Sequence, residues 1–201
     1  EDGAEYLYIA DIGDNARARA YVTVYRVLEP EVDAAQAPGT FSLGGAVALK
    51  MKYPGGSWDA EALFVDPESA DIFIVTKRSD GQSEVLRNPA PHDPASTETM
   101  DVVARLALGT GGLPGSTLVT SGDMSAGGDW IILRTYSHAF LWRRAPGETV
   151  GEAFSTDVCS VPARSEPQGE AIGFAADGSG YFTVSEGSHP PLYFFARTVE
   201  P

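Results

Sequence analysis

A recurring unit of two short apolar strands constrains this chain more than any other feature of its sequence. Each copy opens with an acidic residue at the start of an apolar strand, passes through a turn, and closes with a second apolar strand. The opening acids are Glu61, Asp123 and Glu170. The three copies, the second of them looser than the others, are Trp58 to Arg78, Ser121 to Tyr136 and Pro167 to Glu186. We therefore expect three structurally equivalent strand pairs.

Further short strands are predicted between and around these units. They are rich in branched and aromatic residues and are bounded by Gly, Pro and Asp. The full set is expected at residues 5–10, 21–27, 47–53, 60–65, 71–76, 85–87, 102–108, 123–125, 130–134, 139–143, 156–161, 171–174, 181–185 and 192–196. Helical periodicity is nearly absent, and residues 109–115 are predicted to be a flexible connector. The pattern indicates an all-β protein.

Sets of four short antiparallel strands that recur along a chain are typical of β-propeller blades. A β-sandwich also uses short strands and turns, but it has no reason to open each set with the same acidic strand. We predict a single β-propeller domain over residues 1–201, with about four blades' worth of a five- or six-bladed ring. The first set lacks its opening strand and the last its closing strand, so we expect N-terminal strands or a blade to be missing.

Charge and composition exclude some functions. The net charge is −14 and Lys and Arg number only 14, so no nucleic acid is expected as a partner, because a phosphate backbone is bound through clustered cations. No apolar run approaches the roughly 18 residues that span a bilayer. The single cysteine, Cys159, cannot form an intrachain disulfide and is expected to be a buried small hydrophobe.

The acids that open the strand pairs are the candidate metal ligands. Equivalent positions of the innermost strands of a propeller converge on the central channel, and Glu61, Asp123 and Glu170 are predicted to be such positions. Converging carboxylates repel one another unless a cation or protons compensate, and oxygen-rich sites suit calcium. Asp11 and Asn15, from one polar turn, are expected to add ligands. In the structural alternative, each acid accepts hydrogen bonds from a neighbouring blade's backbone.

Charged residues at the ends of the second strands are the candidate catalytic groups. Lys77, Arg134 and Glu186 lie beside the predicted acidic centre, where a cation would bind an anionic group or stabilise a developing anion. In the alternative interpretation, the cations only neutralise their acidic neighbours. The sequence contains no G-x-S-x-G, Walker, dinucleotide-binding or H-E-x-x-H motif, so nucleophilic catalysis has little support.

Several motifs resemble those of known propeller families. GEAIGF with VSEG and PPLYFF, and DAEALFVDP with IFIVTKR, resemble bacterial propellers of the esterase-like phytase type and, more loosely, gluconolactonase- and regucalcin-like six-bladed propellers. The stretch YIADIGDN, followed by VTVYRVLEP, is similar to a sequence motif of secreted bacterial propellers. By this resemblance Glu61 and Glu170 match the acid that opens the family's strand, Glu186 matches its S-E-G acid, and Asp123 departs from the pattern.

The resemblance covers most of the chain and implies a ring of five or six blades, calcium near its axis, and a phosphoesterase or lactonase activity. We therefore expect a secreted or periplasmic propeller with an acidic, calcium-binding centre and a small-molecule or anionic ligand at the channel mouth. In the catalytic version, metal held by Glu61, Asp123 and Glu170 assists hydrolysis of a phosphoester or lactone. The alternative is a non-catalytic propeller that binds a protein or glycan partner on its face.

Overall fold

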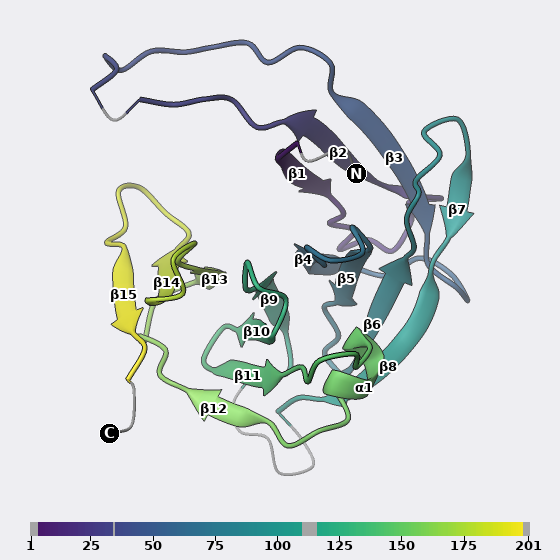
Figure 1. Ribbon diagram of the computed structural model, residues 1–201. Coiled ribbons are helices and arrows are strands. Elements are labelled where there is room, and N and C mark those ends of the chain that lie inside the picture. Colours follow the sequence, from purple (N-terminus) through teal and green to yellow (C-terminus); the bar gives the residue numbers. More distant parts are fainter. Residues whose placement is uncertain (1–3, 34, 110–115, 199–201) are drawn as a thin grey trace.

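The chain folds almost wholly into β-strands, as a computed structural model of residues 4–33, 35–109 and 116–198 shows (Figure 1). The strands are β1 (Tyr6–Asp11), β2 (Val22–Leu28), β3 (Val47–Lys52), β4 (Ala60–Val65), β5 (Ile72–Thr76), β6 (Gln82–Asn88), β7 (Thr97–Thr99), β8 (Asp101–Ala107), β9 (Val119–Met124), β10 (Trp130–Thr135), β11 (Ala139–Arg143), β12 (Cys159–Val161), β13 (Gly169–Phe174), β14 (Gly180–Ser185) and β15 (Tyr193–Ala196). One short helix, α1 (Val150–Ala153), lies between β11 and β12.

The strands form four sheets that follow one another along the chain. Blade A contains β1, β2 and β3 with β7 at its outer edge, blade B contains β4, β5, β6 and β8, blade C contains β9 to β12, and blade D contains β13, β14 and β15. All pairs are antiparallel except that of β3 with β7. Sheets built of successive antiparallel strands, with the first strand of one blade beside the first strand of the next (β4 by β9, β9 by β13), define a β-propeller (Figure 1).

Blade A is arranged differently from the other three. The turn that follows β1 lies against the start of β4, where the Asp14 N–H donates a hydrogen bond of 2.6 Å to the Asp59 carboxylate. Strand β1 therefore ends where β4 begins, and it takes the place that β5, β10 and β14 hold as second strands. Among the strands that the structure describes, none fills the first-strand position of blade A.

Apolar packing between consecutive blades forms the core, and each blade is apolar on the faces that meet a neighbour. Val24 and Leu49 of blade A pack on the face of blade B that carries Ile74 and Leu86. A second cluster joins blades B and C, and a third joins Ile132 of blade C to the inner face of blade D. Each of these three junctions is therefore an apolar sheet-on-sheet contact.

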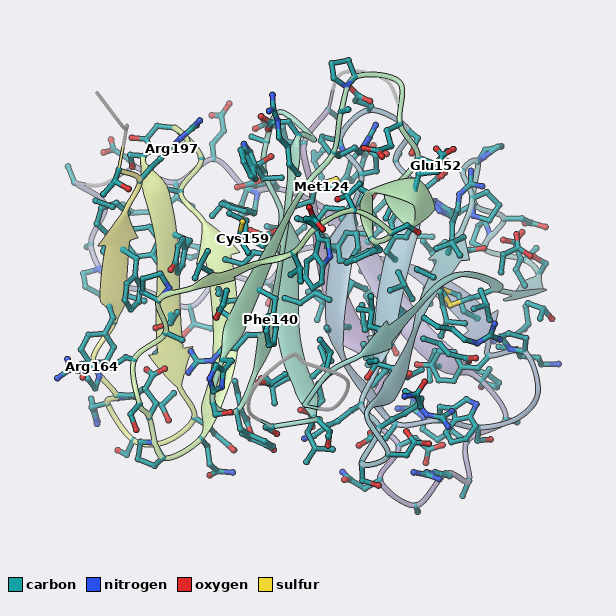
Figure 2. The ribbon with its side chains drawn as sticks, turned by 90° about the horizontal axis from the view of Figure 1, so that it is seen from below. Met124, Phe140, Glu152, Cys159, Arg164 and Arg197 are labelled. Atoms are coloured by element: carbon teal, nitrogen blue, oxygen red, sulfur yellow. The ribbon has the colours of Figure 1, made fainter. Side chains whose placement is uncertain are left out.

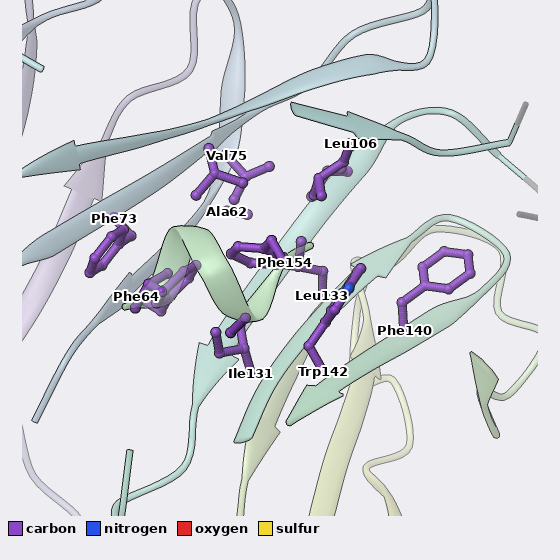
Figure 3. Close-up of a cluster of buried hydrophobic side chains, with 14 of the residues drawn as sticks. Ala62, Phe64, Phe73, Val75, Leu106, Ile131, Leu133, Phe140, Trp142 and Phe154 are labelled. Atoms are coloured by element: carbon purple, nitrogen blue, oxygen red, sulfur yellow. The ribbon is translucent and has the colours of Figure 1, made fainter. Parts of the chain in front are cut away.

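The helix α1 fills the outer part of the space between blades B and C. Its first turn is stabilised by a capping box between Thr149 and Glu152. Phe154, which follows the helix, packs edge-on against Trp142 with ring centroids 5.0 Å apart and also contacts Phe64 at 6.4 Å. Figure 3 shows Phe154 at the centre of this cluster. The helix thus anchors an aromatic side chain that ties the two blades together.

Several expectations from the sequence differ from the structure. Strand β7 and helix α1 were not anticipated, and β9 begins at Val119, four residues earlier than the strand expected at 123–125. The expectation that Cys159 is buried is wrong, because it lies exposed at the start of the edge strand β12. The connector expected at 109–115 falls mostly outside the described residues. Across the described ranges, no helix has the length and apolarity needed to cross a membrane.

Replacing Phe154 with Ala should lower the free energy of unfolding by about 3 kcal/mol, because the deletion leaves a cavity between two packed blades. Urea denaturation followed by circular dichroism measures this change. Phe41→Ala is the matched control, since Phe41 is 67% exposed, and should alter stability by no more than about 0.5 kcal/mol. Equal effects of the two substitutions would contradict the assigned role of Phe154.

Candidate functional site

An extra residue interrupts the first strand of blades B, C and D near its beginning. In blade B, Ala60 pairs with Thr76 and Ala62 pairs with Val75, so Glu61 has no partner in the register. The same shift leaves Thr120 unpaired in β9 and Glu170 unpaired in β13. Such a β-bulge bends the strand and redirects the side chain of the extra residue.

The bulge also switches the faces of the residues that flank it. Ala60 belongs to the core between blades A and B, whereas Ala62 belongs to the core between blades B and C. In a regular strand, residues two apart point to the same face. Glu61 lies between these two alanines. Its side chain belongs to neither core and remains partly exposed at the end of the ring.

A second set of equivalent positions lies directly after the second strand of each blade. Lys77 follows Glu61 by 16 residues, and Tyr136 and Glu186 follow Thr120 and Glu170 by the same interval. The hairpin register places each of these residues just beyond the partner of the residue before the bulge. The two sets therefore meet at one end of the first strands.

Five residues of these sets form a connected group that we call the mouth cluster: Glu61, Lys77, Tyr136, Glu170 and Glu186. The Lys77 ammonium donates to Glu61 Oε2 at 2.7 Å and to the Tyr136 hydroxyl at 2.8 Å. The Tyr136 hydroxyl in turn donates to Glu170 Oε1 at 3.3 Å. Polar contacts thus run without interruption from blade B through blade C to blade D.

Two carboxyl groups of the mouth cluster, those of Glu170 and Glu186, lie close enough to influence each other. Burial raises the pKa of Glu170, and the neighbouring charges of Glu186 and Glu61 raise it further, as does a side-chain hydrogen bond with Glu186. Glu170 therefore keeps its proton to a higher pH than an isolated glutamic acid does.

Lys77 remains charged beside this pair. Burial by itself lowers its pKa, but hydrogen bonds to Glu61 and Tyr136 outweigh that effect and raise the pKa above its ordinary value. The ammonium also lies 4.8 Å from the centre of the Tyr136 ring. A fixed cation and a phenol hydroxyl therefore lie next to a carboxyl group, that of Glu170, whose pKa is raised.

Arg134, a predicted catalytic residue, lies between blades C and D rather than in the mouth cluster. Its side chain is fully buried, forms an ion pair with Glu166, and donates to the Ala171 carbonyl at 3.2 Å. A Cβ atom at Gly169 would come within 1.9 Å of the guanidinium, so only glycine leaves room for it. These contacts give Arg134 an evident role in fixing the start of β13 on blade C.

Asp123 is not the counterpart of Glu61 and Glu170, which corrects the equivalence expected from the sequence. The register assigns that position to Thr120, three residues earlier, whose hydroxyl donates to the Gly169 carbonyl at 2.8 Å. Asp123 lies near the far end of β9 and accepts hydrogen bonds from the N–H groups of Phe174 (2.7 Å) and Met124 (2.9 Å). Burial raises its pKa in spite of these bonds. Asp123 thus accepts hydrogen bonds from the backbone of a neighbouring blade, which is the structural role considered for these acids in the sequence analysis.

Asp11, the last residue of β1, and Asn15, in the turn that follows, lie apart from the hydrogen-bonded contacts of the mouth cluster. Asp11 forms an ion pair of 2.7 Å with Arg19, and Asn15 is exposed. Over residues 4–33, 35–109 and 116–198, no group of three or more His, Cys, Asp or Glu side chains is arranged to hold a metal ion. The five predicted ligands therefore do not form one ligand set, and calcium binding stays a prediction.

The sequence contained a signal for the members of the site that were not predicted. The interval of 16 residues that links Glu61 to Lys77 also links Glu170 to Glu186. Applied to the looser middle copy, the same interval ends at Tyr136 and begins at Thr120. The rule that an acid opens the strand points to Asp123 instead.

Comparisons with known proteins add two structural neighbours. No family model matches the chain, and no curated protein matches it in sequence. TolB from Acinetobacter baumannii is similar in structure, with 12% identity and a TM-score of 0.48; the match covers 96% of this chain and 39% of TolB. The periplasmic gluconolactonase PpgL from Pseudomonas aeruginosa has 14% identity and a TM-score of 0.46, over 96% of this chain and 69% of that protein. The assignment as a β-propeller rests on the sheet topology.

Glu170→Gln should stabilise the protein at neutral pH and have little effect in acid. The folded-state pKa of Glu170 is raised, so its ionisation disfavours the folded state as the pH rises through that pKa. The variant lacks this penalty, and its stability relative to the unchanged protein should increase between about pH 4 and about pH 7. Urea denaturation at the two pH values tests this. Glu31→Gln, at an exposed loop position, should show no such dependence.

Proposed function

We propose that the mouth cluster binds a small neutral ester, a lactone in the first instance, and hydrolyses it by acid–base chemistry. The observation that carries this proposal is the chain of hydrogen bonds that joins Glu61, Lys77, Tyr136 and Glu170, with Glu186 beside it. General acid–base catalysis needs a proton donor and a proton acceptor at one point, and electrostatic stabilisation needs a fixed donor near the oxygen that becomes charged. The cluster contains groups of each kind.

The charge of the mouth cluster favours a neutral substrate. The charges of Lys77 and Glu61 offset each other, and the carboxyl groups of Glu170 and Glu186 leave the cluster with no excess of positive charge. A phosphoester would bring further negative charge against this pair, whereas a lactone brings none. Of the two substrate classes that the sequence resemblance implies, the lactone is therefore the better match.

Each step of the hydrolysis has a group in the cluster. The Glu186 carboxylate takes a proton from a water molecule, whose oxygen adds to the carbonyl carbon of the lactone. Lys77 and Tyr136 donate hydrogen bonds to the carbonyl oxygen as it becomes negative. The ring C–O bond breaks, and the protonated Glu170 gives its proton to the departing oxygen. Transfer of the proton from Glu186 to Glu170 restores the pair, and one hydroxy acid has formed from one lactone and one water.

A panel of five- and six-membered lactones, followed by acid release in the presence of a chelator, tests the proposal. Glu170→Gln and Glu186→Gln should each lower kcat by about 100-fold or more, the usual contribution of a positioned acid or base. Tyr136→Phe removes only the hydroxyl and should also lower kcat. Glu31→Gln keeps the same chemical change at an exposed loop position and should leave the rate unaltered.

Two results would count against this function. One is the absence of lactone hydrolysis by the folded, unsubstituted protein. The other is hydrolysis that survives both Glu170→Gln and Glu186→Gln. Either would favour the alternative of a non-catalytic propeller that binds a protein or glycan partner on its face.

Calcium binding at the channel mouth is a separate proposal, and thermal unfolding tests it. A ligand that binds only the folded state stabilises it by about 2.7 kcal/mol at a hundredfold excess over Kd. A Tm that rises with calcium, relative to chelator, and no longer rises in a Glu61→Gln/Glu170→Gln double variant would support a site at the mouth. No shift would reject it. Calcium sites of extracellular modules have millimolar-range affinities, which would suit the secreted or periplasmic location that the sequence resemblance implies.

A further inference from the structure

Side chains of blade C hold the backbone on both sides of the bulged residue Glu170. The Thr120 hydroxyl donates to the Gly169 carbonyl at 2.8 Å. On the other side of the bulge, Arg134 donates from Nη1 to the Ala171 carbonyl at 3.2 Å. Glu170 lies between these two carbonyls and has no partner in the register of β13 and β14. The two hydrogen bonds therefore fix the direction in which the bulge turns its side chain.

The guanidinium of Arg134 is packed directly against the residue before the bulge. A Cβ atom at Gly169 would lie 1.9 Å from Nη2 and 2.5 Å from Cζ. The side chain of Arg134 is 0% exposed, and that of its ion-pair partner Glu166 is 3% exposed. Within the described part of the chain, neither Nε nor Nη2 of Arg134 has a hydrogen-bond partner. The position of the guanidinium therefore depends on the charge of Glu166 and on the absence of a side chain at Gly169.

The junction between blades B and C has an apolar residue where the next junction has Arg134. Tyr136 of blade C and Lys77 of blade B are equivalent. The residue two positions before Lys77 is Val75, which therefore corresponds to Arg134 and is buried in the apolar core. Well-packed apolar residues often replace a buried ion pair with no loss of stability. The fold thus needs no charge at this position, and the charge occurs at the junction that carries Glu170.

We propose that the Arg134–Glu166 pair positions Glu170 in the mouth cluster by holding the bulge of β13 against blade C. Tyr136 follows Arg134 by two residues, and its hydroxyl lies 3.3 Å from Glu170 Oε1. A bulge held by Arg134 therefore keeps the carboxyl within hydrogen-bond distance of that hydroxyl. Arg134 is a positioning residue, because it is buried, contacts backbone and acts through Glu170. The effect on catalysis rests on the proposed function, whereas the placement of the carboxyl does not.

The double variant Arg134→Met/Glu166→Met removes the pair and keeps apolar bulk at both positions. The carboxyl ¹³C resonance of Glu170, assigned by its loss in Glu170→Gln, reports the pKa of that group. In the unsubstituted chain, burial and the charges of Glu186 and Glu61 raise this pKa. A released bulge moves the carboxyl into water and away from those charges, so the pKa should fall toward that of an exposed glutamic acid. The Tm should be unchanged or higher.

Kinetics and a matched control separate this proposal from the proposed function. On any lactone that the unsubstituted chain hydrolyses, the double variant should lower kcat about 10-fold or more with little change in KM, because a small misplacement of a reacting group slows a reaction that much. Arg164 is exposed at the surface beside blade D (Figure 2). Arg164→Met should alter neither kcat nor the pKa of Glu170. If no lactone is hydrolysed, the proposed function fails, and the pKa still tests the positioning.

Gly169→Ala is a second test that leaves both charges of the pair in place. Its methyl group occupies the space of the guanidinium, so the pKa of Glu170 should fall as in the double variant. An unchanged pKa in the folded double variant or in Gly169→Ala would overturn the proposal. Loss of folding in the double variant would overturn it as well, because the pair would then be a requirement of the fold and not a means of placing one side chain.

Discussion

One additional residue in the first strand of blades B, C and D determines where the polar groups of this protein meet. A regular strand would commit every side chain to one of two packed faces, because both faces of a blade meet a neighbour. The bulge breaks that alternation at Glu61 and Glu170, and the flanking residues Ala60 and Ala62 enter two different cores. A carboxylate at any other position of these strands would face either a buried core or a neighbouring backbone. The mouth cluster forms because the bulge lets the side chain of the extra residue point toward the end of the strand and into neither core.

Acidic residues near the axis of the propeller consequently have two different roles. Asp123 lies where β9 is regular, and its oxygens accept hydrogen bonds from the N–H of Phe174 in the adjacent strand and of Met124 in its own strand. Ser121 acts in the same way toward Ile172. At the bulges, by contrast, the acids contact a lysine, a tyrosine and each other. The position in the strand, more than the residue type, decides whether a carboxylate connects blades or remains available to a ligand.

Much of the fold followed from local sequence, and the site followed in part. Short branched and aromatic runs bounded by turn residues located nearly every strand, because strand formation and hairpin turns are encoded within a few residues. Strand β7 was not predicted, since its partner β3 is distant in sequence and its residues Thr97–Thr99 have no apolar alternation. Glu61, Lys77, Glu170 and Glu186 were each predicted as site residues, and the structure brings them together.

The error at Asp123 has a physical origin. A bulge shifts the register by one residue, and the sequence pattern of a bulged strand looks the same as that of a regular one. The acid was therefore aligned by type, and Thr120, which occupies the equivalent position, was overlooked because its hydroxyl serves the neighbouring Gly169 carbonyl. Tyr136 was not predicted as a site residue, because its partners Lys77 and Glu170 come from two other blades.

Strand β7 has a consequence for the way in which the chain reaches this structure. It is flanked in sequence by β6 and β8, so it is drawn into place when blade B forms, but its hydrogen bonds are made only once β3 is present. Blade A therefore cannot complete its outer edge until β7, which lies far beyond β3 in sequence, is available. Unfolding of blade B would pull β7 away from β3, and unfolding of blade A would leave β7 without a partner. Blades A and B should accordingly behave as one cooperative folding unit, of the kind that hydrogen exchange resolves within larger domains.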